Sequence, residues 1–185
     1  GKDITVPASV IIAKNFIQTF TTEGRQKAVM GVSRGLVGDY KQCLWVPSKK
    51  QADDMYIRNI NPIINVPGRG LVKMGQKTGL PKVSKSNRSN VRLKQNEIEN
   101  EINTIVETFV AEDTTPYWWD KLNTAIINVL QKRLDNSEIN NFETQCDASN
   151  NPQEVRDANE IRIKVSIDYI TAAEIIRITY ISKNI

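Results

Sequence analysis

The sequence of 185 residues contains no histidine. Histidine is the usual base of hydrolytic triads and a frequent zinc ligand, so its absence argues against both kinds of site. The two cysteines, Cys43 and Cys146, lie far apart and form no CxxC pair. We expect both thiols to be reduced and buried, as in most cytoplasmic proteins, although the sequence leaves a disulfide open. We also expect no metal, no cofactor and no catalytic residue.

Long apolar runs are missing as well. No stretch approaches the ~18 consecutive apolar residues of a membrane helix, and the first residues lack a basic segment followed by an apolar one. The sequence therefore predicts neither membrane insertion nor a secretion leader in these residues. Hydrophobic residues make up 39% of the chain, and most isoleucines and valines fall in periodic segments, so a folded domain is expected.

The segment from Asn59 to Thr78 is dense in turn-forming residues. The residue before Pro62 is disfavoured in a helix, and the glycines that follow Pro67 allow a positive φ at little cost. We expect a chain reversal here between two short strands, at residues 63–64 and 71–74.

The same segment resembles a phosphate-binding loop in its spacing of glycines. Gly70 and Gly75 are separated by four residues, but Lys77 stands one position too late for that motif. Pro81 also argues against the helix whose amides would hold a phosphate. We interpret the segment as a structural turn, with nucleotide binding as the weaker alternative.

A run of basic residues without an acidic one lies between positions 73 and 94. It contains no aromatic residue that could stack on a base, and no recognition motif surrounds it, so nucleic acid is a disfavoured partner. A solvated loop and a basic surface for an acidic protein partner are the two main interpretations. The run comprises Lys73, Lys77, Lys82, Lys85, Arg88, Arg92 and Lys94, of which Lys82, Lys85 and Arg88 are candidate interface residues.

Two amphipathic helices are predicted in the second half of the chain. From 96 to 111, isoleucines and other apolar residues recur at helical spacing, with acidic residues in the first turns that the helix dipole would favour as solvated charge. Thr115 and Pro116 form a helix start, with a capping hydroxyl and a proline at the first position, and this helix should run to about Leu134 with Trp119 in the core. Earlier in the chain, Ser48 should cap a short helix over 49–59, and residues 8–20 are either a helix or short packed elements.

Strands are predicted at 142–146, 161–169 and 174–181, because apolar and polar residues alternate there. The last strand carries isoleucine on both faces, which is typical of a strand covered on each side or completing a sheet with another chain. Its candidate inter-subunit residues are Ile176, Ile178 and Tyr180. The fold class predicted is α+β: a small, mainly antiparallel sheet packed against two amphipathic helices, with extended terminal segments.

Two blocks of this sequence resemble the signature of contractile tail sheath proteins of bacteriophages. The first reads INPI, PGRG and MGQKT between residues 60 and 78, where the family usually has tryptophan in place of Met74, so the packing there is expected to differ. The second is FETQCDASNNP at 142–152. The residues that carry the resemblance are Asn61, Pro62, Pro67, Gly68, Gly70, Gly75, Thr78, Cys146 and Asp147.

The resemblance implies a structural subunit rather than an enzyme. Sheath subunits form helical rings around a tail tube in the phage tail, are assembled in the host cytoplasm, and contract to drive the tube through the host envelope. The implied partners are other sheath subunits and the tube protein, with no small-molecule substrate. Residues 1–185 would be one C-terminal, tube-proximal domain of a longer protein, with 174–185 as a possible strand-exchange arm. Sheaths of bacterial injection and bacteriocin devices are the alternative within the class.

Overall fold

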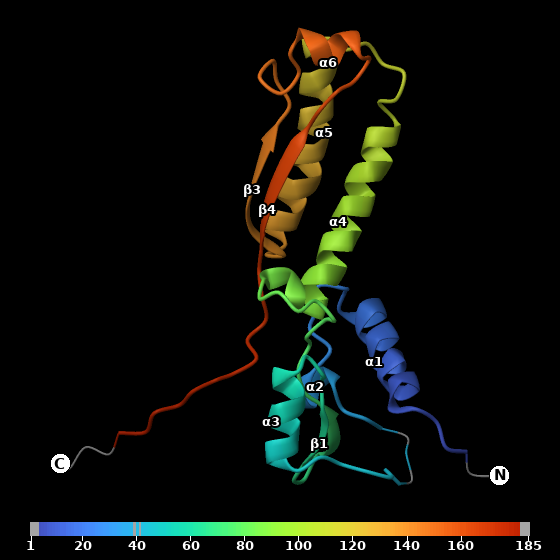
Figure 1. Cartoon of the computed structure of the whole chain (residues 1–185), viewed down its shortest axis with the longest axis vertical. Helices are drawn as coiled ribbons and strands as arrows, with labels where there is room; N and C mark the ends of the chain where they lie inside the picture. The colour runs from blue at the N-terminus through green and yellow to red at the C-terminus, as the bar shows by residue number, and fades with distance from the viewer. Residues whose placement is uncertain (1–3, 39, 41, 182–185) are drawn as a thin grey trace. The chain divides into compact units, whose positions relative to one another are not determined.

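The computed structural model describes residues 4–38, 40 and 42–181. The chain forms two compact units (Figure 1): unit 1 contains residues 1–83 and 171–185, and unit 2 contains residues 84–170. The assignment of residues 1–185 to one domain stays a prediction.

Unit 1 is built around the predicted chain reversal. Its described residues form the helices α1 (Ala8–Thr22), α2 (Gly31–Arg34) and α3 (Lys49–Ile57) and the strands β1 (Ile63–Val66) and β2 (Gly70–Lys73). The strands pair antiparallel, with Val66 opposite Gly70, and Leu36 forms a bridge to Val72 on the other side of β2. Because β2 is paired on both sides, its Leu71 and Val72 are buried.

Local signals fix the start of α3. The hydroxyl of Ser48 accepts a hydrogen bond from the amide of Gln51, and the side chain of Gln51 accepts one from the amide of Ser48. This reciprocal capping satisfies two amides that the first helical turn leaves without partners. The predicted helix over 49–59 is therefore confirmed, ending two residues early at Ile57.

Unit 2 packs a two-stranded hairpin against two long helices. In chain order it contains η1 (Lys85–Asn87), α4 (Ser89–Glu107), α5 (Pro116–Asp135), β3 (Ile139–Gln145), α6 (Gln153–Asp157) and β4 (Lys164–Tyr169). β3 and β4 pair antiparallel, with a register shift between Ile139 and Asn141, and Figure 1 shows them beside α5.

The core of unit 2 lies between the helices and the hairpin. Ile98 of α4 and Ile126 and Leu130 of α5 are fully buried. Burial of such a side chain contributes about 1.5 to 3 kcal/mol, so these stripes hold the helices together. Trp119 lies in the same cluster, as predicted. The α+β fold class is confirmed, although the described residues contain two separate two-stranded sheets.

Arg133 connects α4 to α5 and to the start of β3. Its guanidinium lies 3.3 Å from Glu97, 2.6 Å from Glu101 and 3.0 Å from Glu138. Burial alone would lower the pKa of Arg133, but hydrogen bonds to Glu101 and Glu138 raise it further above its usual value. Glu97 and Glu101 are thus partly exposed, as solvated charge would be, but they also pair with Arg133, which the sequence did not predict.

Several boundaries differ from the sequence prediction. α4 begins at Ser89 rather than at residue 96, so the end of the basic run is helical and not a loop. The hydroxyl of Thr115 makes no capping hydrogen bond, and Cys43 is exposed while Cys146 is buried. β4 begins at Lys164 instead of 161, and α6 was not predicted.

Candidate functional site

The first signature block folds into a clamp around Asn61. The side chain of Asn61 donates to the carbonyl of Lys77 and accepts from the amide of Lys77, both at 2.8 Å. The carboxamide thus pairs with Lys77 as a peptide group of a neighbouring strand would. Gly68 and Gly70 have positive φ values of 71° and 87°, which close the turn between β1 and β2.

Gly75 and Lys77 hold the ring of Tyr56. Gly75 has φ +82°, and a Cβ at this position would lie 2.4 Å from Cε2 of Tyr56, so only glycine leaves room for the ring. The ammonium of Lys77 lies 4.2 Å from the ring centroid and donates to the carbonyl of Tyr56 at 2.6 Å. The Lys77 amine is therefore engaged by the protein itself.

No helix follows this glycine-rich segment: the next described elements after β2 are a 3-10 turn at Lys85–Asn87 and then α4. The hydroxyl of Thr78 accepts a hydrogen bond from the amide of Leu80 at 3.3 Å. A phosphate loop would offer its amides, lysine and threonine to a nucleotide. Here Lys77 and Thr78 both make contacts within the chain, which favours the structural turn.

The second signature block forms a tight loop after β3. Asp147 accepts hydrogen bonds from the hydroxyl and the amide of Ser149, which lower the pKa of its carboxyl. Burial raises the pKa of the Cys146 thiol. Asn151, fully buried, accepts from the amide of Arg162 at 2.6 Å and donates to its carbonyl at 2.9 Å. The loop therefore joins the end of β3 to the segment that precedes β4.

The basic run does not form one solvated surface. Lys73 is buried, and its amine donates to the carbonyls of Val29 and Gly75 at 2.8 Å. Lys94 is also buried and donates to the carbonyls of Glu138 and Ile170. The solvated-loop interpretation was wrong for these two lysines.

The three candidate interface residues of the run, Lys82, Lys85 and Arg88, lie between β2 and α4. Lys85 forms an ion pair with Asp168 of β4, and hydrogen bonds from Lys85 and Asn140 lower the pKa of that carboxyl. Lys82 is exposed and Arg88 is partly buried. Their role in an interface stays a prediction.

The C-terminal segment, here residues 175–181, forms neither helix nor strand. Its apolar side chains are exposed, with Ile176 81% exposed, Ile178 66% and Tyr180 88%. The strand predicted here is therefore absent from the chain as described by itself. An apolar row of this kind is uncommon on the surface of a soluble monomer and typical of a segment that another chain covers.

A groove of about 490 Å³ lies between α4 and β4 in unit 2. Its lining combines apolar side chains of α4 and β4 with polar side chains of α4, and burial raises the pKa of Tyr169, one of the lining residues, to about 12. The lining residues are Gln95, Ile98, Glu99, Ile102, Asn103, Val165, Ile167 and Tyr169.

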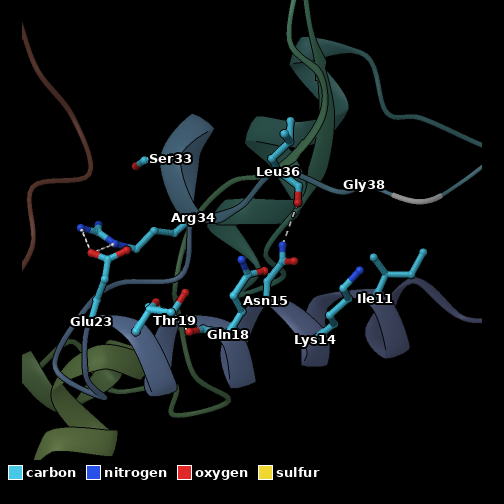
Figure 2. A pocket seen from close by; sticks show the side chains of 11 residues that line it. Ile11, Lys14, Asn15, Gln18, Thr19, Glu23, Ser33, Arg34, Leu36 and Gly38 are labelled. Carbon is cyan, nitrogen blue, oxygen red and sulfur yellow. Dashed lines mark hydrogen bonds and ion pairs between the residues drawn. The ribbon is translucent and has the colours of Figure 1, made fainter.

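A smaller cavity, of about 310 Å³, lies in unit 1 between α1 and residues 33–38 (Figure 2). Asn15 donates to the carbonyl of Leu36 at 2.9 Å, and Arg34 pairs with Glu23 at 2.8 Å, which lowers the pKa of that carboxyl. These polar groups pair with one another, so the cavity gives no sign of a ligand. No cluster of potential metal-binding side chains and no helix able to cross a membrane occur among the described residues.

Comparison with solved structures shows proteins of the same fold. No family model matches the chain. Its fold is shared with known structures: it superposes on a chain of the anti-feeding prophage baseplate with a TM-score of 0.87 and 20% identity, covering 97% of this chain and 51% of that one. A contracted sheath complex of an extracellular contractile injection system, PVC, gives 0.86 and 21% identity, covering 98% and 52%.

The proteins with similar sequences are phage tail sheath proteins. The chain is 25% identical over 156 residues to the tail sheath protein of Salmonella phage ViI, covering 84% of this chain and 25% of that protein. It is 27% identical over 172 residues to that of Enterobacteria phage T4, covering 90% and 26%. The chain thus spans about a quarter of the length of these relatives. The comparisons confirm the resemblance to contractile tail sheath proteins that the two signature blocks indicated.

Proposed function

We propose that this chain is part of a structural subunit of a contractile phage tail sheath. The observation that carries the proposal is its similarity to phage tail sheath proteins over 84% of its length. In this role the subunits stack as helical rings around the tail tube and contract to drive the tube through the host envelope. The subunit acts in the virion tail after assembly in the host cytoplasm, and needs no catalytic residue, cofactor or small-molecule substrate.

The sheath of a bacterial contractile injection device is the second candidate. The observation that favours it is the fold similarity to the two injection-system structures, which extends over 97% and 98% of this chain. Both candidates use the same subunit design. Particles purified from the source organism distinguish them, because a phage tail is attached to a DNA-filled head and an injection device is not.

The link between subunits is, in this proposal, an exchanged strand. The groove beside β4 is lined in part by the apolar side chains of Ile98, Ile102, Val165 and Ile167, and Ile176, Ile178 and Tyr180 alternate along the exposed C-terminal segment. A neighbour's segment paired with the edge of β4 opposite β3 would place these three side chains in the groove, and the N–H groups of each strand would donate to the carbonyls of the other. Subunits joined in this way stay connected while their folded parts rotate during contraction.

Cysteine cross-linking tests this arrangement. Ser166 is exposed on β4, and Thr179 alternates with the apolar residues of the C-terminal segment, so both lie on the outward face of the proposed pairing. We expect Ser166→Cys with Thr179→Cys, in a full-length sheath protein carrying Cys43→Ser, to give ladders of linked subunits in assembled tubes and none in monomers. Glu154→Cys on α6 replaces Ser166→Cys as the control.

Two outcomes would contradict the proposal. Full-length protein that forms no tube under any condition, by negative-stain microscopy, would argue against a sheath subunit. Tubes that form without ladders of linked subunits would support the sheath function and contradict the proposed pairing of the C-terminal segment with β4.

The tube is the second proposed partner, through Lys82, Lys85 and Arg88. Charge reversal of all three should weaken tube association at low salt and leave the fold intact, because the pair of Lys85 and Asp168 is exposed and solvent screens it. Reversal of Lys164, exposed on β4, is the matched control. Unchanged sedimentation of the triple variant with tubes would remove these residues from the interface.

A further inference from the structure

Tyr56 and Glu174 bring the first signature block and the C-terminal segment together. The hydroxyl of Tyr56 donates a hydrogen bond to the carboxylate of Glu174, across 118 positions of sequence. Both residues belong to unit 1 and both are partly buried. A hydrogen bond to an ionised carboxylate is stronger than one between neutral groups.

The burial pattern changes at Glu174. Ala172 and Glu174 are partly buried and alternate with exposed Thr171 and Ala173. From Ile175, which is 73% exposed, to Ile181, which is 81% exposed, every residue is exposed. Glu174 is thus the last residue of the described chain whose side chain is held by unit 1.

Tyr56 is itself fixed on several sides. Its ring lies where a Cβ of residue 75 would be, and the Lys77 ammonium covers the ring and bonds its carbonyl. Lys77 is in turn paired with Asn61. The buried ammonium of Lys73 lies in the field of the Glu174 carboxylate, and this attraction partly opposes the fall in the pKa of Lys73 caused by burial.

We propose that Glu174 is the anchored root of the C-terminal segment: the first signature block holds Tyr56, and Tyr56 holds Glu174, so that residues 175–181 leave unit 1 from a fixed point. This assigns a function to Gly75 and Lys77 that neither the turn nor the sheath role explains. Glu174 acts here as a positioning residue. Its importance for the polymer rests on the proposed function, since a fixed root would pass the motion of unit 1 to the neighbour that binds the segment.

Backbone ¹⁵N relaxation on the chain of 185 residues tests the anchor without assembly. In the native chain the order parameter at residues 173 and 174 should match that of β1 and β2, about 0.85, and fall below about 0.6 beyond residue 176. Tyr56→Phe, which removes only the hydroxyl, should move this boundary back to about residue 171. Tyr180→Phe makes the same change at an exposed ring and should move nothing.

Glu174→Ala and Glu174→Gln provide a second pair, in a segment without secondary structure. Alanine removes every acceptor and should release the root as Tyr56→Phe does, while glutamine keeps a carbonyl oxygen for the hydroxyl and should retain part of the order. Unchanged order parameters at 173 and 174 in both Tyr56→Phe and Glu174→Ala would overturn the anchor. Release of the root in a protein that never forms tubes would leave the anchor standing and reject only the sheath function.

Discussion

Arg133→Met should lower the free energy of unfolding of unit 2 by about 3 to 5 kcal/mol, the usual cost of leaving a buried charge without its partner. The guanidinium of Arg133 forms ion pairs with three carboxylates. Their side chains differ in exposure: that of Glu138 is 6% exposed, that of Glu97 31% and that of Glu101 35%. Methionine fills most of the volume but provides no charge. The loss should therefore come mainly from Glu138, whose side chain is the least exposed of the three.

Single neutral substitutions separate the three pairs. Glu97→Gln should cost only about 0.2 to 1 kcal/mol, because its carboxylate is partly solvated in the folded chain and the remaining carboxylates still neutralise Arg133. Adding Glu138→Gln to Arg133→Met should recover part of the loss, because the buried carboxylate is then gone.

Urea unfolding at pH 7 measures these differences. In a Trp45→Phe background the fluorescence comes from Trp118 and Trp119 of α5, so the transition reports unit 2. A loss below about 1 kcal/mol for Arg133→Met, or an equal loss for Glu97→Gln, would refute the argument that the desolvated partner determines the cost.

Three further changes test unit 1 and the C-terminal segment. Burial lowers the pKa of Lys73 to about 8 from 10.5, so between these values the unfolded chain binds more protons than the folded chain. The free energy of unfolding should therefore rise with pH by up to about 1.4 kcal/mol per pH unit in that range. Lys73→Met should lack this rise in urea unfolding from pH 7.5 to 9.5, and parallel curves for the two proteins would contradict the argument. Deleting everything from Ile175 on should change stability by less than about 1 kcal/mol, because the apolar side chains of 175–181 are at least 66% exposed; a loss above about 2 kcal/mol in thermal unfolding would show that the segment belongs to the core. Gly75→Ala should cost more than about 1 kcal/mol through the clash with Tyr56 and the positive φ, while Gly79→Ala, with no atom within 4 Å of the added Cβ, should stay within about 0.5 kcal/mol; equal costs would remove the steric argument.

The sequence predicted the elements whose signals are local. Ser48 with Gln51, and Pro116 at a first helical position, set the starts of α3 and α5, and the turn between β1 and β2 follows from Gly68 and Gly70. The apolar residues at helical spacing also predicted that Ile98 of α4 and Trp119 of α5 are buried. Each of these signals depends on a few neighbouring residues, so no tertiary knowledge was needed.

The errors arose where a distant partner determines the role of a charge. Lys94 reads as solvated in sequence, but its amine is buried because the carbonyls of Glu138 and Ile170 accept from it. Because Lys94 was assigned to a basic loop, the helix was predicted to begin at residue 96, whereas α4 begins at Ser89. Arg133 lies on an apolar stripe because acidic residues from α4 face it.

The candidate site divides in the same way. Asn61, Gly70 and Gly75 could be named from the sequence because a motif contains them. Glu174 could not be named, since its partner Tyr56 lies 118 positions away and no periodicity connects them. For Ile176, Ile178 and Tyr180 the sequence left two alternatives open, burial within this chain or pairing with another chain, and their exposure excludes burial within the described chain.

The exposed C-terminal segment also makes the newly synthesised chain prone to aggregation. Five large apolar side chains, Ile175, Ile176, Ile178, Tyr180 and Ile181, are presented together, and an extended apolar segment without a partner is a template for unwanted pairing. The risk rises with concentration and with the time that a subunit waits before it is captured. In the proposed sheath, rapid addition to a growing end would protect the chain from aggregation, and a cell that makes subunits faster than the ends accept them should accumulate insoluble protein.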